Sequence, residues 1–304
     1  PNVARFFSQR FAQVTNPPLD SIREADGMTL RVALGAKPNS GGKAAPQIVV
    51  PTPILTHLEM LKIRDQKHTP VERFGMFYRI DLDDSEANAQ ALVRGIDKLC
   101  DEVEEFARET GGIAVISDRH VESGMAAIPL IIAVSAINQR LIEEGMRLRV
   151  SVIAESGQIC SSHHVATALG FGASAVYPLG VQMRAEEKFG PDETQVAAAF
   201  KRFAKAAEKS LMKTMGRVGL CTVESYIGGE FFEPSYLDTG EPALFRRGDP
   251  GAAVRASSAV PALSKAEALA PSTAIRLPRK RPKSTTGSTE WKTRPVARAA
   301  ASSP

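Results

Sequence analysis

Cysteines are scarce in this chain of 304 residues, and long hydrophobic runs are absent. The three cysteines, Cys100, Cys160 and Cys221, lie about 60 residues apart and form no C-x-x-C pair. This spacing argues against a disulfide framework and against a zinc or iron–sulfur site, so no metal ligand is predicted, and it favours a cytoplasmic location. No stretch of about 18 apolar residues occurs, so we expect no membrane partner. The start at Pro1 without Met or signal sequence suggests processing or a fragment.

Nucleotide-binding loops are missing as well. No G-x-G-x-x-G follows the first strand and no G-x-x-x-x-G-K-[ST] occurs, which excludes the dinucleotide fingerprint and the P-loop. Residues 1–240 hold 26 Lys and Arg against 30 Asp and Glu, whereas residues 241–304 hold 12 against 4. The net charge of +4 therefore comes from the last fifth of the chain, and no nucleic-acid partner is predicted.

The last segment, residues 241–304, differs in composition from the rest. It is rich in Ala, Pro, Ser and Arg and has no lasting periodicity. Because such a segment cannot bury much apolar surface, we predict a disordered basic tail. An out-of-frame translation of a GC-rich gene would give this mixture of residues, and we interpret the tail in that way.

Between residues 74 and 225, short apolar runs alternate with amphipathic segments. Leu92, Ile96, Leu99 and Val103 recur at helical spacing and are followed by Gly111 and its neighbouring glycine. We expect strands at 74–82, 113–117, 147–156, 173–178 and 220–225, helices at 86–109, 130–145, 161–172 and after residue 192, an extended segment at 47–55, and a loop followed by a helix within 1–35. This alternation predicts an α/β fold of parallel βαβ units, as in part of a (β/α) barrel or a doubly wound sheet.

Polar residues stand where three of these strands end. They are Asp118 and Arg119, Glu155 and Ser156, and Tyr177. Ligands of parallel α/β folds bind at the carboxyl ends of strands, so these residues are candidates for a small anionic ligand. The alternative is that Asp118 and Glu155 cap the following helix or pair with Arg119.

A cysteine and two adjacent histidines, Cys160, His163 and His164, could suggest a nucleophile or a metal site. Adjacent histidines on a helix point to different faces and cannot share a metal as i, i+4 histidines do. We therefore expect one histidine to pack and the other to be solvated, with an incidental cysteine.

Several long segments together resemble the large subunit of glutamate synthase, specifically its central domain. These are "FFSQRFAQVTNPPLDSIRE", "MTLRVALG", the run from "VISDRHV" to "GASAVYP", and "FAKAAEKSLMKTMGRVGLCTVESYIGGEFFE". The resemblance covers about residues 3–240. It implies a partial (β/α) barrel-like central domain over 1–190, a linker and the start of the FMN-barrel domain over 191–240, and the tail over 241–304.

The resemblance also implies an activity for the complete enzyme, an oxidoreductase that makes L-glutamate from 2-oxoglutarate and glutamine in ammonia assimilation. Its amidotransferase domain releases ammonia, its FMN domain carries FMN and a [3Fe-4S] cluster, and electrons come from ferredoxin or from NADPH through a small flavoprotein subunit. The central domain links the two catalytic domains and lines the ammonia tunnel. The partners implied are therefore these two domains and the flavoprotein subunit.

The sequence also departs from that family. It has no N-terminal cysteine nucleophile, no closely spaced cysteine set and no remaining FMN barrel. No catalytic or cofactor-binding residue can be carried over, and we expect the chain alone to bind no cofactor and to be inactive. Candidates for contact with the tunnel or the neighbouring domains are Arg10, Gln13, Thr15 and Asn16. The alternatives are a stand-alone, non-catalytic scaffold protein and an enzyme that uses the strand-end residues on a small ligand.

Overall fold

The computed structural model describes residues 2–10, 27–38, 40, 46–80, 84–229 and 231–234, except for the side chains of residues 85, 86 and 234. All of them belong to one compact unit of the chain. The predicted tail and the candidates Gln13, Thr15 and Asn16 lie outside the described residues. Within the described part of the chain, no helix is long and apolar enough to cross a membrane.

The centre of the fold is a four-stranded parallel sheet with three crossover helices. The strands are β4 (Val71–Gly75), β6 (Gly112–Ser117), β8 (Val150–Ser156) and β9 (Ala175–Pro178), and the helices are α3 (Ser85–Glu109), α4 (Leu130–Glu143) and α5 (Ser162–Gly170). The strands lie in sequence order, β4-β6-β8-β9. A doubly wound sheet would reverse its order at a switch point, so the arrangement is that of a barrel segment. The predicted α/β fold of βαβ units is confirmed.

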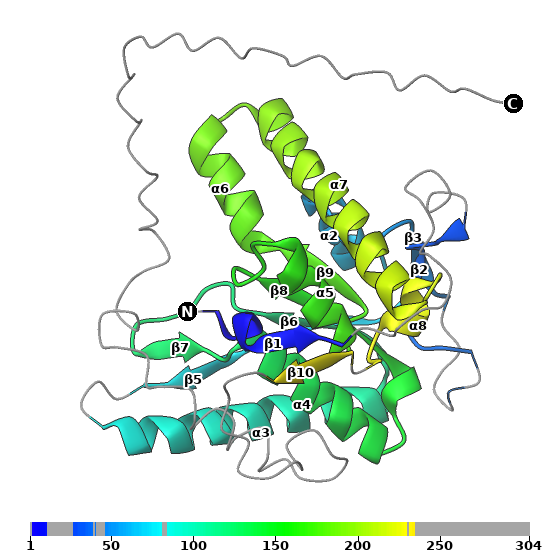
Figure 1. Ribbon diagram of the computed structural model, residues 1–304. Helices are drawn as coiled ribbons and strands as arrows, with labels where there is room; N and C mark the ends of the chain where they lie inside the picture. Colours follow the sequence, from blue (N-terminus) through cyan, green and yellow to red (C-terminus); the bar gives the residue numbers. More distant parts are fainter. Residues whose placement is uncertain are drawn as a thin grey trace, which may run out of the picture. The chain divides into compact units, whose positions relative to one another are not determined.

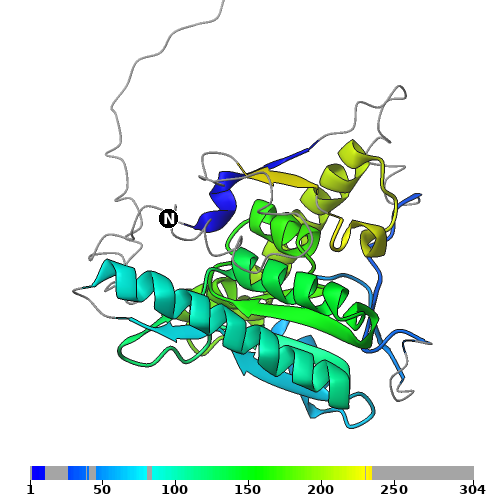
Figure 2. The same ribbon diagram turned by 90° about the horizontal axis from the view of Figure 1, so that it is seen from below.

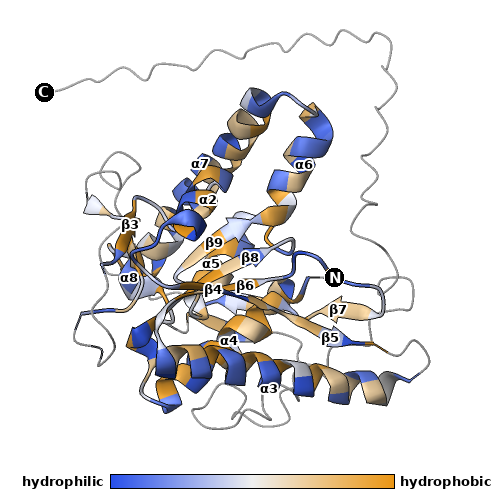
Figure 3. Cartoon of the chain, turned by 180° about the vertical axis from the view of Figure 1, so that it is seen from behind, coloured by the Kyte–Doolittle hydropathy of each residue, from blue (hydrophilic) through white to orange (hydrophobic). Residues whose placement is uncertain are grey.

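The helix layer follows the same order, with α3 against α4 and α4 against α5 (Figures 1 and 2). The apolar positions predicted for α3, among them Leu92, Ile96, Leu99 and Val103, are all buried, and Figure 3 shows a hydrophobic stripe along a helix that is otherwise hydrophilic. Phe106 of α3 meets Phe74 of β4 edge to face, with ring centroids 5.8 Å apart. Phe74 and its register partners therefore face the helix layer, and the alternate residues of each strand face away from it.

Helices α6 (Leu179–Phe189) and α7 (Glu193–Val218) form a hairpin that projects from the carboxyl end of the sheet (Figure 1). α6 starts directly after β9, and the sequence prediction missed it. α7 begins where the sequence placed it, since the Asp192 side chain accepts a hydrogen bond from the Gln195 N–H, and it ends at Gly219 in the left-handed conformation.

Three two-stranded antiparallel sheets complete the described residues. They pair β1 (Phe7–Gln9) with β10 (Phe232–Pro234), β2 (Val32–Leu34) with β3 (Ile48–Val50), and β5 (Phe77–Arg79) with β7 (Met125–Ala127). The remaining elements are η1 (Val3–Phe6), η2 (Arg147–Arg149), α2 (His57–Asp65) and α8 (Val223–Tyr226).

Two sequence predictions were wrong. The strand expected at 74–82 is divided, because Gly75 ends β4 and Phe77 starts a strand that pairs with β7 instead. The second half of the strand expected at 220–225 belongs to helix α8, and in the first half Thr222 forms an isolated bridge with Thr29. The helix expected within 1–35 follows Pro17 and Pro18 in the sequence and therefore lies outside the described residues, which hold η1, β1 and β2 in this part of the chain.

Candidate functional site

A polar row crosses the sheet at its carboxyl edge. Ser117 of β6 is the register partner of Glu155 in β8, and Glu155 is the register partner of Tyr177 in β9. All three residues are buried. Because partners in register share a face, their side chains all lie on the face turned away from the helix layer.

Two arginines close over the carboxylate in this row. Nε of Arg119 donates to Glu155 Oε1 at 3.0 Å, and Nη2 of Arg73 lies 3.1 Å from Glu155 Oε2. The same Nη2 donates to Ser117 Oγ at 2.9 Å. The Glu155 side chain is 8% exposed, whereas those of Arg73 and Arg119 are 43% and 32% exposed. One buried carboxylate therefore holds two guanidinium groups that reach solvent.

Tyr177 extends the row toward α2. Its hydroxyl lies 2.9 Å from Nδ1 of His57, the first residue of that helix. Burial raises the pKa of Tyr177 to about 12, although Arg119 opposes the shift, so the hydroxyl stays protonated at neutral pH. α2 itself starts with a capping box between Thr56 and Glu59, which fixes the position of His57.

Asp118 and Ser156 form a separate contact behind the row. The Asp118 carboxylate accepts hydrogen bonds from Ser156 Oγ at 2.6 Å and from the Gly157 N–H at 2.9 Å. Burial raises the pKa of Asp118, although these hydrogen bonds oppose the shift. Asp118 therefore caps the turn after β8, close to the capping role considered from the sequence.

The five strand-end candidates are thus brought together in two groups, and Tyr177 belongs to the group of Glu155. Arg119 pairs with Glu155, and Asp118 pairs with Ser156. Sequence reasoning missed Arg73 and His57 as neighbours of the site. Arg73 stands two residues before the end of β4, and the predicted strand began after it; correct placement of that strand would have shown the residue.

The first and last segments of the described chain are bound to each other, and we call these contacts the end clasp. β1 pairs with β10, and Arg10 Nε lies 2.8 Å from Glu233 Oε1. The Gln9 side-chain amide donates to the Thr214 carbonyl at 3.3 Å. Arg10, a candidate for contact with other domains, therefore bonds to its own chain.

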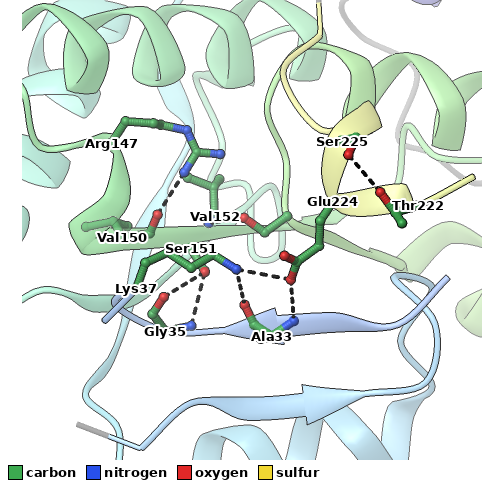
Figure 4. A network of polar contacts seen from close by, with 11 residues as sticks. Ala33, Gly35, Lys37, Arg147, Val150, Ser151, Val152, Thr222, Glu224 and Ser225 are labelled. Carbon is green, nitrogen blue, oxygen red and sulfur yellow. Dashed lines mark hydrogen bonds and ion pairs between the residues drawn. The ribbon is translucent and has the colours of Figure 1, made fainter. Parts of the chain in front are cut away.

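A second part of the end clasp joins β2 to α8 (Figure 4). Glu224 Oε1 accepts hydrogen bonds from the Ala33 N–H at 2.9 Å and from Lys37 Nζ at 3.0 Å. Burial opposes ionisation of Glu224, but these two donors outweigh it and lower its pKa. Ser151 of β8 donates to the Gly35 carbonyl and accepts from its N–H, which seats this segment on the sheet.

The cysteine and histidine group does not form a nucleophile pair. Nδ1 of His164 accepts from the Cys160 N–H at 3.2 Å, while the Cys160 thiol lies 3.5 Å from the Gly157 carbonyl. Although the residue is exposed as a whole, desolvation of its thiol raises the pKa of Cys160, which leaves it protonated. His163 packs edge to face on Phe232.

The cysteines and histidines do not assemble into a metal site in the part of the chain that the structure describes. Across the described ranges, no three His, Cys, Asp or Glu side chains are grouped so as to hold a metal ion. Cys100 is buried, Cys160 and Cys221 are exposed, and all three are free thiols. These residues do not fit an iron–sulfur cluster, which needs several convergent thiolates.

Together, the sheet order and the strand-end cluster define an α/β protein built as a segment of a (β/α) barrel. Residues 1–237 match the family described as the glutamate synthase central domain, and the chain belongs to this family.

Curated relatives agree with this assignment. The chain is 33% identical over 243 residues to a ferredoxin-dependent glutamate synthase of Cyanidium caldarium, covering 75% of this chain and 16% of the relative. It is 30% identical over 233 residues to the large chain of the NADPH glutamate synthase of Bacillus subtilis, covering 75% and 15%. The chain thus spans about one sixth of the length of these relatives.

Solved structures give more distant similarities. A flavocytochrome b2 variant with bound sulfite superposes with a TM-score of 0.38 and 15% identity, over 60% of this chain and 40% of that one. A mandelate oxidase mutant with a monooxide FMN adduct superposes with a TM-score of 0.41 and 13% identity, over 76% and 88%.

Proposed function

We propose that this chain acts as the central part of a glutamate synthase that makes L-glutamate from 2-oxoglutarate and glutamine. In that role it links an amidotransferase domain to an FMN domain and lines the path of ammonia between them. The relatives named above support the activity. FMN, a [3Fe-4S] cluster, and ferredoxin or NADPH through a small flavoprotein subunit would serve the complete enzyme, in the cytoplasm.

The end clasp is the observation that carries the linking role. The strand at Phe7–Gln9 pairs with the strand at Phe232–Pro234, and Thr29 bridges to Thr222. Any domain joined before β1 and any domain joined after β10 would therefore leave this unit at neighbouring points. Neighbouring junctions would bring the two flanking domains close to each other, which fits the linking role.

The strand-end cluster supports a non-catalytic role for the chain alone. Glu155, the acid in the row, is bonded to Arg73 and Arg119, and Tyr177 stays protonated, so neither provides a free general base. The division into 1–190, 191–240 and 241–304 remains a proposal. Gln13, Thr15 and Asn16 stay candidates for contact with the neighbouring domains.

The test has two parts. The purified chain, given glutamine, 2-oxoglutarate and NADPH, should oxidise no NADPH; measurable oxidation would contradict the assignment of an inactive part. In a complete enzyme that contains this domain, Glu224→Ala together with Arg10→Ala should raise the ammonia released per glutamate formed, because the clasp is loosened.

Glu187→Ala and Arg64→Ala provide the matched control, since both residues are exposed and lie outside the end clasp. An unchanged ratio of ammonia to glutamate in the clasp variant, at unchanged thermal stability, would argue against the linking role. It would favour the second candidate, a stand-alone scaffold protein, whose clasp would serve folding alone.

A further inference from the structure

We propose that the carboxyl edge of the parallel sheet holds an oxyanion-binding site formed by Arg73 and Arg119. The ligand group is the carboxylate or phosphate of a small molecule. This inference goes beyond the proposed function and does not depend on it.

Glu155 and Ser117 hold the two guanidinium groups in place. Glu155 binds each through a different oxygen, Oε1 for Arg119 and Oε2 for Arg73, and Ser117 Oγ contacts both residues, accepting from the Arg73 side chain and from the Arg119 N–H at 3.1 Å. These contacts fix the guanidinium positions before a ligand arrives. Because side-chain ordering is a main penalty in binding, such pre-organisation favours association.

Both arginines keep donors for a ligand. Arg73 uses only Nη2 toward the described residues, which leaves its Nε–H and Nη1 groups for solvent or an anion. Arg119 bonds to Glu155 through Nε and also contacts the Tyr177 hydroxyl. Guanidinium N–H groups match the oxygens of carboxylates and phosphates in spacing and charge.

Two further acidic side chains lie near the arginines. Asp118 directs its carboxylate to Ser156 and to the Gly157 N–H. Glu186 of α6 acts on Tyr177, but it is exposed and accepts a hydrogen bond from Gln182 at 2.7 Å. Since these acids offset the positive charge, the affinity must come from directed hydrogen bonds, which favours oxyanions over halides.

The backbone beside Arg119 supports the assignment. His120 has φ 66° and is the single non-glycine residue with positive φ among the described residues. A side chain in this region is uncommon, and such conformations concentrate at binding sites. The site also stands at the carboxyl ends of parallel strands, where α/β folds place their ligands.

The test is calorimetric titration of the full chain at constant ionic strength with three probes: inorganic phosphate, 2-oxoglutarate and chloride. We expect a Kd of about 1 mM or below for one of the two oxyanions and no binding of chloride. Phosphate alone identifies a phosphate group as the ligand, and 2-oxoglutarate alone identifies a carboxylate. If neither phosphate nor 2-oxoglutarate binds, the proposal is overturned.

Variants locate the site. Arg119→Ala and Arg73→Ala should each weaken binding at least about tenfold, since each removes charge-assisted hydrogen bonds. Glu155 keeps one arginine in either variant, and thermal melting checks that the fold persists. Arg119→Lys should bind more weakly than wild type because it loses the planar fork.

Arg108→Ala is the matched control, because Arg108 is an exposed arginine that pairs with an acid, Glu104, near the end of α3. Equal weakening in this variant would show non-specific charge effects and overturn the assignment. The assignment would also be overturned if the Arg73 and Arg119 variants both bound the oxyanion with unchanged affinity.

Discussion

The two ends of the parallel sheet use arginine in different ways. At the amino end, Arg147 donates to the Val150 and Gly172 carbonyls, each at 2.9 Å, and its Nε donates to the Asn138 side chain. Burial lowers the pKa of Arg147. At the carboxyl end, Arg73 and Arg119 share the Glu155 carboxylate and still reach solvent.

The acceptors around a guanidinium group decide whether it stabilises the fold or stays available to a ligand. Arg147 has neutral acceptors on three sides and acts as a structural tie between η2, α4 and the turn before β9. The carboxyl-end arginines have a charged anchor on one side and open donors on the other. The same residue type therefore stabilises the fold at one edge and offers contacts to a ligand at the opposite edge.

Loss of the amino-end arginine should give the largest effect. Arg147→Ala removes three hydrogen bonds and leaves carbonyls without donors, so we expect a loss of about 3 kcal/mol in the free energy of unfolding. Urea denaturation followed by circular dichroism measures it. Arg64→Ala, which removes an exposed ion pair with Asp65, should change stability by less than about 0.5 kcal/mol. A similar change in both variants would erase the contrast between the hydrogen-bonded Arg147 and the exposed Arg64.

Removal of the carboxyl-end anchor should have a smaller effect. Glu155→Ala deprives Arg73 and Arg119 of their shared acceptor, but both can turn to water, so we expect a loss of about 1–2 kcal/mol. The same urea titration applies. A loss equal to that of Arg147→Ala would mean that the carboxyl-end arginines are as enclosed as Arg147, contrary to the comparison.

The Lys37–Glu224 ion pair of the end clasp should have the smallest effect on stability, and this effect should depend on pH. The pKa of Glu224 in the folded chain lies below its ordinary value of 4.5. The carboxylate therefore adds stability above that pH, and this contribution is lost as the pH falls through the lowered pKa. Stability measured from about pH 6 down to about pH 3 should fall more in the wild type than in Glu224→Gln, by less than about 1 kcal/mol, because the pair is half exposed.

The exposed Glu187 on α6 provides the reference for this pH series. Glu187→Gln should follow the wild-type curve. A Glu224→Gln curve that also runs parallel to the wild type would show that the contacts with Ala33 and Lys37 add nothing to folding.

Much of the helix and strand pattern was predictable, because it depends on local signals. The spacing of Leu92 through Phe106 defined α3, and Asp192 marked the start of α7. Helix α2 was missed although Thr56 and Glu59 have the spacing of a capping box, a signal that the sequence does contain. The segment from Phe74 was predicted as one strand. The chain changes its pairing partner at Met76 because the second half pairs with β7, which lies about 50 residues later in the sequence.

The site was predictable only in part. Strand ends pointed to Arg119, Glu155 and their neighbours, because parallel strands bring their carboxyl ends together. Arg73 and His57 came from outside the predicted strands. The end clasp could not be predicted, because strands of three residues carry almost no periodicity and their partners lie at opposite ends of the described chain.

The pairing of β1 with β10 also affects the order in which the chain can fold during synthesis. Gln9 can pair with Phe232 only after Phe232 has left the ribosome, about 220 residues later. At typical rates of 5–20 residues per second, β1 remains without its partner strand for about 10–45 s. During that interval the parallel sheet can form from neighbours in sequence, whereas the first strand stays open to other partners, so this segment is the part of the unit most dependent on protection while it is being made.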